Sequence, residues 1–171
     1  QHPAARAKLR AEIDRVLGRR VPTMQDLDEL HYTEQVINES LRLYSPIHSI
    51  SRVALEADTL GGYTIPAGAT IYVSLHATHR LERFWPDAER FDPERFAPEQ
   101  NERRPRFAFI PFAAGHRNCI GGTTAIAELK LAIALLAQRY ELDLAPGHRV
   151  EAAAGTTMYP RYGMNMLARA I

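Results

Sequence analysis

The chain has 171 residues, of which 46% are hydrophobic and 24% charged, and its formal net charge is +1. This length supports one substantial core, and the composition excludes an intrinsically disordered chain. The near-neutral charge predicts no nucleic-acid partner, and the sequence contains neither an apolar run that could span a membrane nor a signal peptide.

The first 46 residues are predicted to be helical. Apolar residues recur at helical spacing between Pro3, which suits a first helical turn, and Gly18, which ends the pattern. Thr23 is a candidate N-cap for a short helix that reaches about residue 30. Another helix is predicted over residues 32–44, because Pro46 blocks its continuation.

Glu39 and Arg42 lie on this last helix at positions i and i+3, so their side chains share one face. By residue type alone, they form a surface ion pair of roughly 0.3–0.5 kcal/mol, which is common on helices. The pair by itself therefore carries little information on function.

A β-rich segment follows over residues 47–76. Turns are predicted at Gly61-Gly62 and at Pro66-Ala67-Gly68. The strands between them are predicted over residues 52–56, 63–65 and 70–75. This pattern indicates a small antiparallel sheet, in which Arg52 would ordinarily be a solvated strand residue.

Residues 77–111 show no clear periodicity beyond a short helix expected near residues 76–81. Prolines and aromatic residues indicate an ordered irregular segment, with a solvated loop over Glu99–Arg106. This segment includes the sequence Pro93-Glu94-Arg95-Phe96.

The only cysteine, Cys119, stands in a glycine-bounded loop just before a long helical pattern. A thiol at a helix start lies near free N–H donors and a positive dipole end, and Arg117 adds a cation, so the thiolate is favoured. A lone cysteine is most often a small buried apolar residue. The other interpretations are a nucleophile with His116 and a metal ligand, although one Cys and one His are too few for zinc.

A helix is predicted over Thr123–Tyr140, and short strands near 141–144 and 164–170 follow it. The apolar stripe of this helix consists of Ile126, Leu129, Ile133, Leu136 and Tyr140. Its other side consists of Glu128, Lys130, Gln138 and Arg139. The stripe requires a partner, so the chain on its own is expected to associate or aggregate.

The cysteine loop resembles the haem-thiolate loop F-x-x-G-x-R-x-C-x-G of the cytochromes P-450. Five positions match at the right spacing: Phe112, Gly115, Arg117, Cys119 and Gly121. The E-x-x-R of Glu39 and Arg42 and the P-E-R-F segment precede it in the order of that family. The chain thus resembles the C-terminal portion of the P-450 fold, from the J helix to the C-terminus.

This resemblance implies one partial domain that is mainly α with small antiparallel β-sheets (α+β). Its expected segments are helices including the E-x-x-R helix (1–46), a small β-sheet (47–76), the meander (77–111), the haem-Cys loop (112–121), the L helix (122–140) and C-terminal strands (141–171). The resemblance also implies that Glu39, Arg42 and Arg95 are structural and hold the meander against the haem loop.

The implied cofactor is haem b, with Cys119 as the proximal ligand of its iron. Arg117 and Arg52 would meet the propionates, and Phe112 would pack on the porphyrin, with Gly115 and Gly121 shaping the loop. The implied reaction is monooxygenation of an apolar substrate by O₂, with electrons from a ferredoxin or a flavin reductase. In a bacterium the location would be cytoplasmic.

Two positions in the chain depart from the family pattern, because Ala113 stands where glycine is frequent and Thr124 where an aromatic residue is frequent. The oxygen-activating distal motif A-G-x-[DE]-T-T is absent, so we expect a fragment that lacks the N-terminal portion of the fold and is inactive alone. The alternatives are a haem-binding or structural remnant without catalysis and, with less support, a thiol hydrolase using Cys119 and His116.

Overall fold

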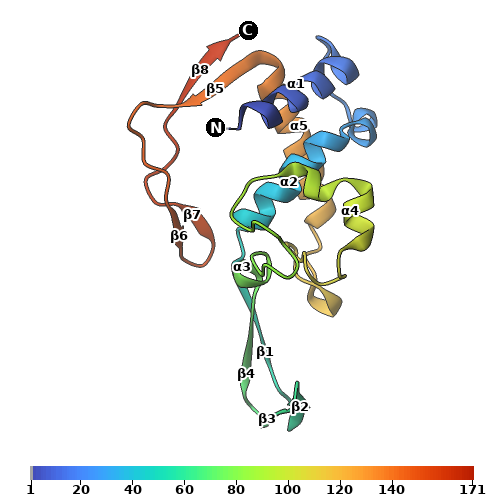
Figure 1. Ribbon diagram of the computed structural model, residues 1–171, viewed down its shortest axis with the longest axis vertical. Coiled ribbons are helices and arrows are strands. Elements are labelled where there is room, and N and C mark those ends of the chain that lie inside the picture. The colour runs from blue at the N-terminus through green and yellow to red at the C-terminus, as the bar shows by residue number, and fades with distance from the viewer. Residues whose placement is uncertain (1) are drawn as a thin grey trace.

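The computed structural model describes residues 2–171 and leaves out Gln1, with which the first expected segment begins. Helices form its centre and paired strands extend from it (Figure 1). The α-helices are α1 (Pro3–Leu17), α2 (His31–Leu43), α3 (Leu75–Thr78), α4 (Pro98–Arg103) and α5 (Gly122–Arg139). The 3-10 helices are η1 (Met24–Glu29), η2 (Pro93–Phe96) and η3 (Gly115–Arg117).

The strands form four antiparallel pairs, β1–β4, β2–β3, β5–β8 and β6–β7. They are β1 (Ser49–Val53), β2 (Asp58–Leu60), β3 (Tyr63–Ile65), β4 (Thr70–Ser74), β5 (Tyr140–Leu144), β6 (Ala152–Ala154), β7 (Met158–Pro160) and β8 (Met166–Ala170). The predicted fold class, mainly α with small antiparallel sheets, is confirmed. The sequence missed β2, β6 and β7, which are only three residues long. Of these, β2 pairs with β3 across Gly61-Gly62, where both φ angles are positive.

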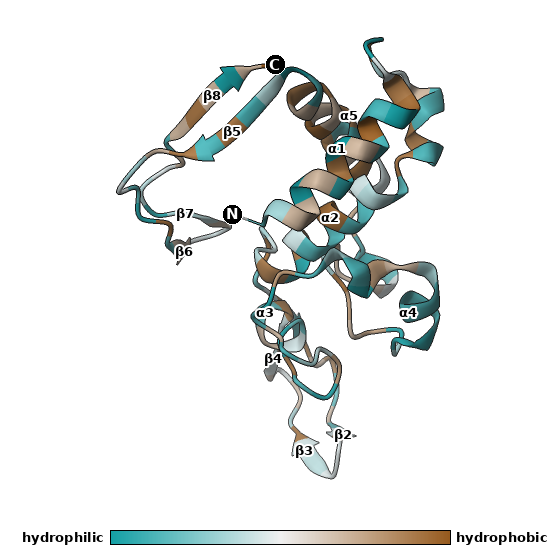
Figure 2. Ribbon diagram, turned by 45° about the horizontal axis from the view of Figure 1, so that its top comes forward, coloured by the Kyte–Doolittle hydropathy of each residue, from teal (hydrophilic) through white to brown (hydrophobic). Residues whose placement is uncertain are grey.

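The helical core lies where α1, η1 and α5 meet. Its buried members are Ile13, Leu17, Leu27, Leu30 and Ala134. On α5, small residues such as Ala134 let α1 approach closely, whereas Leu129 and Leu136 of the predicted stripe remain 38% and 47% exposed. Figure 2 shows the hydrophobic colouring of α5. Part of the stripe is therefore exposed on the described residues, while Ile126 and Ile133 are partly buried. That another part of the protein covers the stripe stays a prediction.

Lys130 lies on the side of α5 away from the predicted stripe, but it is buried there. Lys130 is 7% exposed; its Nζ atom donates to the carbonyl of Leu27 at 2.9 Å and pairs with Glu34 at 2.5 Å. A buried ammonium is tolerated only with such partners, and here η1 and α2 supply them. Lys130 thereby joins α5 to the two preceding helices.

A second cluster fills the irregular segment between β4 and the cysteine loop. Trp85, Ala88, Phe96 and Ala108 are buried there, and Phe84 and Phe109 pack against them. The rings of Phe96 and Phe109 meet edge to face at 4.7 Å. The expected loop at 99–106 is partly wrong, because Pro98 starts the exposed helix α4 and fixes its first turn.

Candidate functional site

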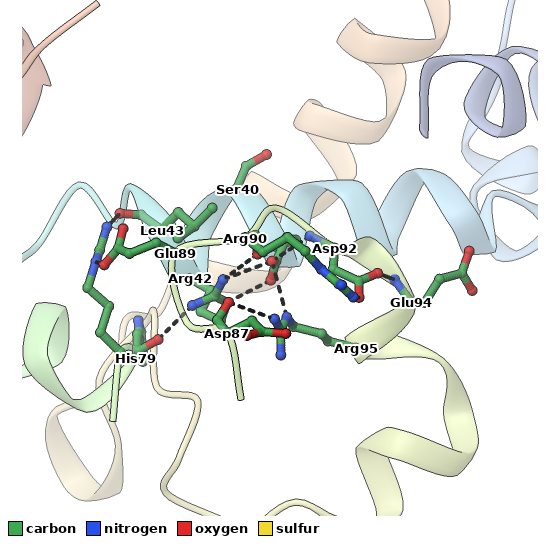
Figure 3. Close-up of polar contacts among 12 residues, drawn as sticks. Ser40, Arg42, Leu43, His79, Asp87, Glu89, Arg90, Asp92, Glu94 and Arg95 are labelled. Carbon is green, nitrogen blue, oxygen red and sulfur yellow. Dashed lines mark hydrogen bonds and ion pairs between the residues drawn. The ribbon is translucent and has the colours of Figure 1, made fainter. Parts of the chain in front are cut away.

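A buried ion pair on α2 connects this helix to the irregular segment (Figure 3). Glu39 and Arg42 are both fully buried. Arg42 donates from Nε to Glu39 Oε2 at 2.7 Å and from Nη2 to Glu39 Oε1 at 2.9 Å. The backbone N–H of Asp92 donates to Glu39 Oε1 at 2.8 Å. The pair is therefore a tertiary link, unlike the surface ion pair that its spacing alone predicts.

The remaining donors of Arg42 reach backbone carbonyls that are distant in sequence. Nη1 donates to the carbonyl of His79 at 2.8 Å and Nη2 to that of Arg90 at 3.2 Å. The guanidinium also lies over the Trp85 ring, 5.1 Å from its centroid. Because each charge has several partners, the desolvation cost of the pair is offset.

Arg95 of η2 lies beside this ion pair, next to Glu39, where the resemblance to the P-450 fold would put it. Its Nε lies 3.6 Å from Glu39 Oε1, close enough for an ion pair, and its Nη2 donates to the carbonyl of Asp87 at 3.0 Å. Glu39 thus lies between two arginines from different elements. This arrangement fixes η2 and the preceding turn against α2.

His79 is a residue of this site that the sequence did not single out. It is fully buried next to Arg42, and its Nε2 accepts a hydrogen bond from the Ile110 N–H at 3.0 Å. Nε2 must therefore carry a lone pair, which places the proton on Nδ1. Burial, with a smaller effect from Arg42, lowers the pKa of His79 to about 4. Only its burial, which depends on distant segments, distinguishes His79 from the other histidines.

We expect acid to destabilise the protein through His79. The imidazole is neutral when folded, and its pKa is about 4 folded against 6.5 unfolded, so its contribution is fully present above pH 6.5 and declines as the pH falls towards 4. The full loss is about 3 kcal/mol. Besides Arg42, the charged or titratable groups that act on His79 are Arg80 and His76, and both also disfavour its protonation.

His79→Gln retains an acceptor for Ile110 and cannot titrate, so the stability of this variant should change less between pH 7 and pH 4.5. The measurement is the thermal midpoint of the complete protein as a function of pH. The matched control is His148→Gln, at a partly buried residue hydrogen-bonded to Gly163. An equally steep acid loss in His79→Gln would contradict the prediction.

The cysteine loop presents its thiol at the surface of the described residues. The Cys119 N–H donates to the carbonyl of Phe112 at 2.8 Å, which closes the loop, and Cys119 is exposed. Gly115 has a φ of +74°, which suits glycine. A Cβ atom on Gly121 would meet the Cys119 sulfur at 3.9 Å, an ordinary contact, so space alone does not require glycine there.

The first turn of α5 packs directly against this loop. A Cβ atom on Gly122 would lie 3.2 Å from the Phe112 ring, so the ring and the helix backbone approach closely. A cleft of about 490 Å³ beside the loop includes Phe112, Cys119 and Ile126 in its lining. The loop therefore has a fixed position relative to α5, with the thiol beside an open cleft.

The predicted propionate partners and the predicted nucleophile pair lie at exposed positions. Arg117 is on η3, and Arg52 is on β1 with its Nη1 donating to the carbonyl of Ser51 at 2.8 Å. Neither arginine forms an ion pair within residues 2–171. No hydrogen bond joins His116 to Cys119 in this part of the chain, so the geometry offers no support for a thiol hydrolase.

Ala113 has a φ of +63°, a left-handed conformation that costs a non-glycine residue about 1–2 kcal/mol. This conformation explains why glycine is frequent at the corresponding position of the P-450 cysteine loop. Ala113→Gly should stabilise the loop by up to about 1 kcal/mol, because the relieved strain exceeds the added freedom of the unfolded chain. A raised unfolding temperature of the complete protein would confirm this. Ala114→Gly, at a neighbour with extended backbone, is the control and should lower that temperature.

Two segments that are distant in sequence, the residues before β1 and the turn between β6 and β7, are joined in the structure. The N–H of Met158 donates to the carbonyl of Pro46 at 2.7 Å. His48 Nε2 lies 3.1 Å from the carbonyl of Gly155 and, since a carbonyl only accepts, acts as the donor. The turn between β6 and β7 is thus fixed to the start of β1.

The comparisons with known proteins agree with this geometry. Residues 1–163 match the protein family described as "Cytochrome P450". A cytochrome P450 of Mycobacterium bovis is 40% identical over 168 residues, which cover 98% of this chain and 36% of that protein. The cyclooctat-9-en-7-ol 5-monooxygenase of Streptomyces melanosporofaciens is 44% identical over 146 residues, 85% of this chain and 32% of that protein.

The crystal structure of the cytochrome P450DA heme domain superposes with a TM-score of 0.93 at 30% identity, covering 99% of this chain and 38% of that one. The chain therefore belongs to the cytochrome P450 family. It spans 36% of the mycobacterial relative, about a third of its length. No helix within residues 2–171 combines the length and hydrophobicity that crossing a membrane requires.

Proposed function

We propose that this chain is the haem-binding C-terminal portion of a P450 monooxygenase and that Cys119 is the proximal ligand of the haem iron. The observation that carries the proposal is the exposed thiol in a loop closed by the Cys119–Phe112 hydrogen bond. One exposed thiolate fits a haem iron, which Cys119 would hold from this side.

Three further residues, Arg117, Arg52 and Phe112, also fit the binding of a haem. Arg117 projects from η3 without a carboxylate partner in residues 2–171, so it can bind a propionate in a fork geometry. We assign the same role to Arg52, and we propose that Phe112, held against Gly122, packs on the porphyrin. Haem b, when bound here, would supply the oxygen chemistry. Cys119 would hold the iron and donate electron density to it.

The network of Glu39, Arg42 and Arg95 has a structural role in this proposal. It fixes η2 to α2, and the segment that follows η2 leads into the cysteine loop. His79 extends this support to the loop entry through its hydrogen bond from Ile110, two residues before Phe112. The position of the thiol thus depends on buried groups more than twenty residues away in sequence.

The reaction that we propose is insertion of one oxygen atom from O₂ into an apolar substrate, with electrons from a ferredoxin or a flavin reductase. A relative named as a monooxygenase supports the reaction class. The joined segments around Pro46 and Met158 would form part of the substrate wall. We further propose that the cofactor is haem b and that the six segments expected from the sequence form a single partial domain. We also propose that the 171 residues are inactive on their own.

The test is the spectrum of the complete protein, reduced and exposed to CO. A red-shifted Soret band is expected for thiolate ligation, and a band typical of histidine ligation would overturn the proposal. The thiolate band without substrate-dependent O₂ consumption, across a panel of apolar compounds and with an electron donor present, would favour the alternative of a haem-binding remnant.

A further inference from the structure

A cleft remote from the cysteine loop gathers positive charge. It encloses about 480 Å³, a volume typical of small-molecule sites, between the turn at Phe84–Pro86, η2 and α4. Its lining includes four arginines: Arg83, Arg95, Arg103 and Arg104. No residue of the loop 112–121 lines it.

The acidic residues in this cleft are already paired with cations outside it. Asp92 pairs with Arg90 at 2.5 Å, and Glu94 pairs with Lys8 at 2.5 Å. Arg83, Arg103 and Arg104 form no ion pair with any carboxylate in residues 2–171. The cleft therefore has an excess of positive charge that the described chain does not neutralise.

Arg104 is held in place before any ligand arrives. Its guanidinium lies 4.4 Å from the Trp85 ring centroid and 4.5 Å from that of Phe96. It donates to Asn101 Oδ1 at 2.7 Å and to the carbonyl of Arg95. Burial lowers its pKa to about 10, so it is still a cation at neutral pH. A half-buried guanidinium whose orientation is fixed loses little freedom when it binds an anion.

We propose that this cleft binds a small multivalent oxyanion, one that carries phosphate or carboxylate groups. Arg104 forms the fixed back of the site, and Arg83 and Arg103 close over the ligand from the two sides. Guanidinium forks match the oxygen geometry of both groups. Because Arg95 lines the cleft and also lies 3.6 Å from Glu39, a bound anion connects the cleft to the buried network.

The test titrates the complete haem-loaded protein with pyrophosphate and, separately, with citrate, at constant ionic strength, by calorimetry. Saturable binding of at least one is expected, and tighter binding of pyrophosphate or of citrate identifies the ligand as a phosphate or a carboxylate. Arg83→Gln with Arg103→Gln should weaken binding about tenfold or more. These residues are exposed, so the variant should fold.

The matched control is Arg106→Gln, which removes the same type of charge from an exposed residue near α4 that does not line the cleft. Its affinity should stay within about twofold of the unmodified protein. Absence of saturable binding of both probes would overturn the proposal. An equal loss of affinity in Arg106→Gln would also overturn it, since binding would then reflect general surface charge.

Discussion

Replacing Cys119 by serine is expected to abolish the red-shifted Soret band of the reduced CO complex and the oxygenation activity that we propose for the complete protein. A serine hydroxyl has the size of the thiol but does not supply a thiolate to iron. Because Cys119 is exposed, the substitution leaves no cavity, and the fold should persist. The measurements are the CO difference spectrum and substrate-dependent O₂ consumption.

Ile120→Val serves as the control for this variant. Ile120 follows Cys119 directly and is fully exposed, so the shorter side chain leaves the loop hydrogen bond between Cys119 and Phe112 in place. The thiolate band should survive in this variant. If the Cys119→Ser protein retained the band, the assignment of Cys119 as the iron ligand would be wrong.

Replacing Glu39 by glutamine is expected to destabilise the protein by about 3–5 kcal/mol, because the Arg42 charge would stay buried without its carboxylate. Arg95 would lose the same partner. We expect a lower yield of haem-loaded protein and haem loss at a lower temperature. Both are measured by following the Soret band on heating.

The control is Glu89→Gln, which breaks the ion pair with Arg80 at 2.7 Å, where the Glu89 side chain is 77% exposed. An exposed pair contributes about 0–1 kcal/mol, so this variant should nearly match the unmodified protein. Similar haem-loss temperatures for Glu39→Gln and Glu89→Gln would show that the buried pair is not essential to the fold.

The sequence predicted most elements of the fold because their signals are local. Apolar spacing and the residues that start or stop helices located α1, α2 and α5 to within a few residues. The resemblance located the E-x-x-R pair, the P-E-R-F segment and the cysteine loop because it depends on residue type and order. The resemblance also implied a structural role for Glu39, which helix periodicity alone did not.

Contacts between segments distant in sequence could not be predicted from the sequence alone. Lys130 is buried because a carbonyl of η1 and Glu34 of α2 meet its ammonium, and periodicity on α5 cannot reveal those partners. The neutral state of His79 likewise depends on its burial beside Arg42. The hydrogen bond between His48 and Gly155 joins residues 107 positions apart.

The sequence by itself thus determined the family, the helices and the residue proposed to hold iron, because these follow from local pattern and motif order. Only the tertiary structure decided which charges are buried and paired and which remain free. The cost of burying a charge depends on every partner that surrounds it, and those partners come from all parts of the chain. For the same reason, only the structure separated the satisfied guanidinium of Arg42 from that of Arg104, which has no carboxylate partner in residues 2–171.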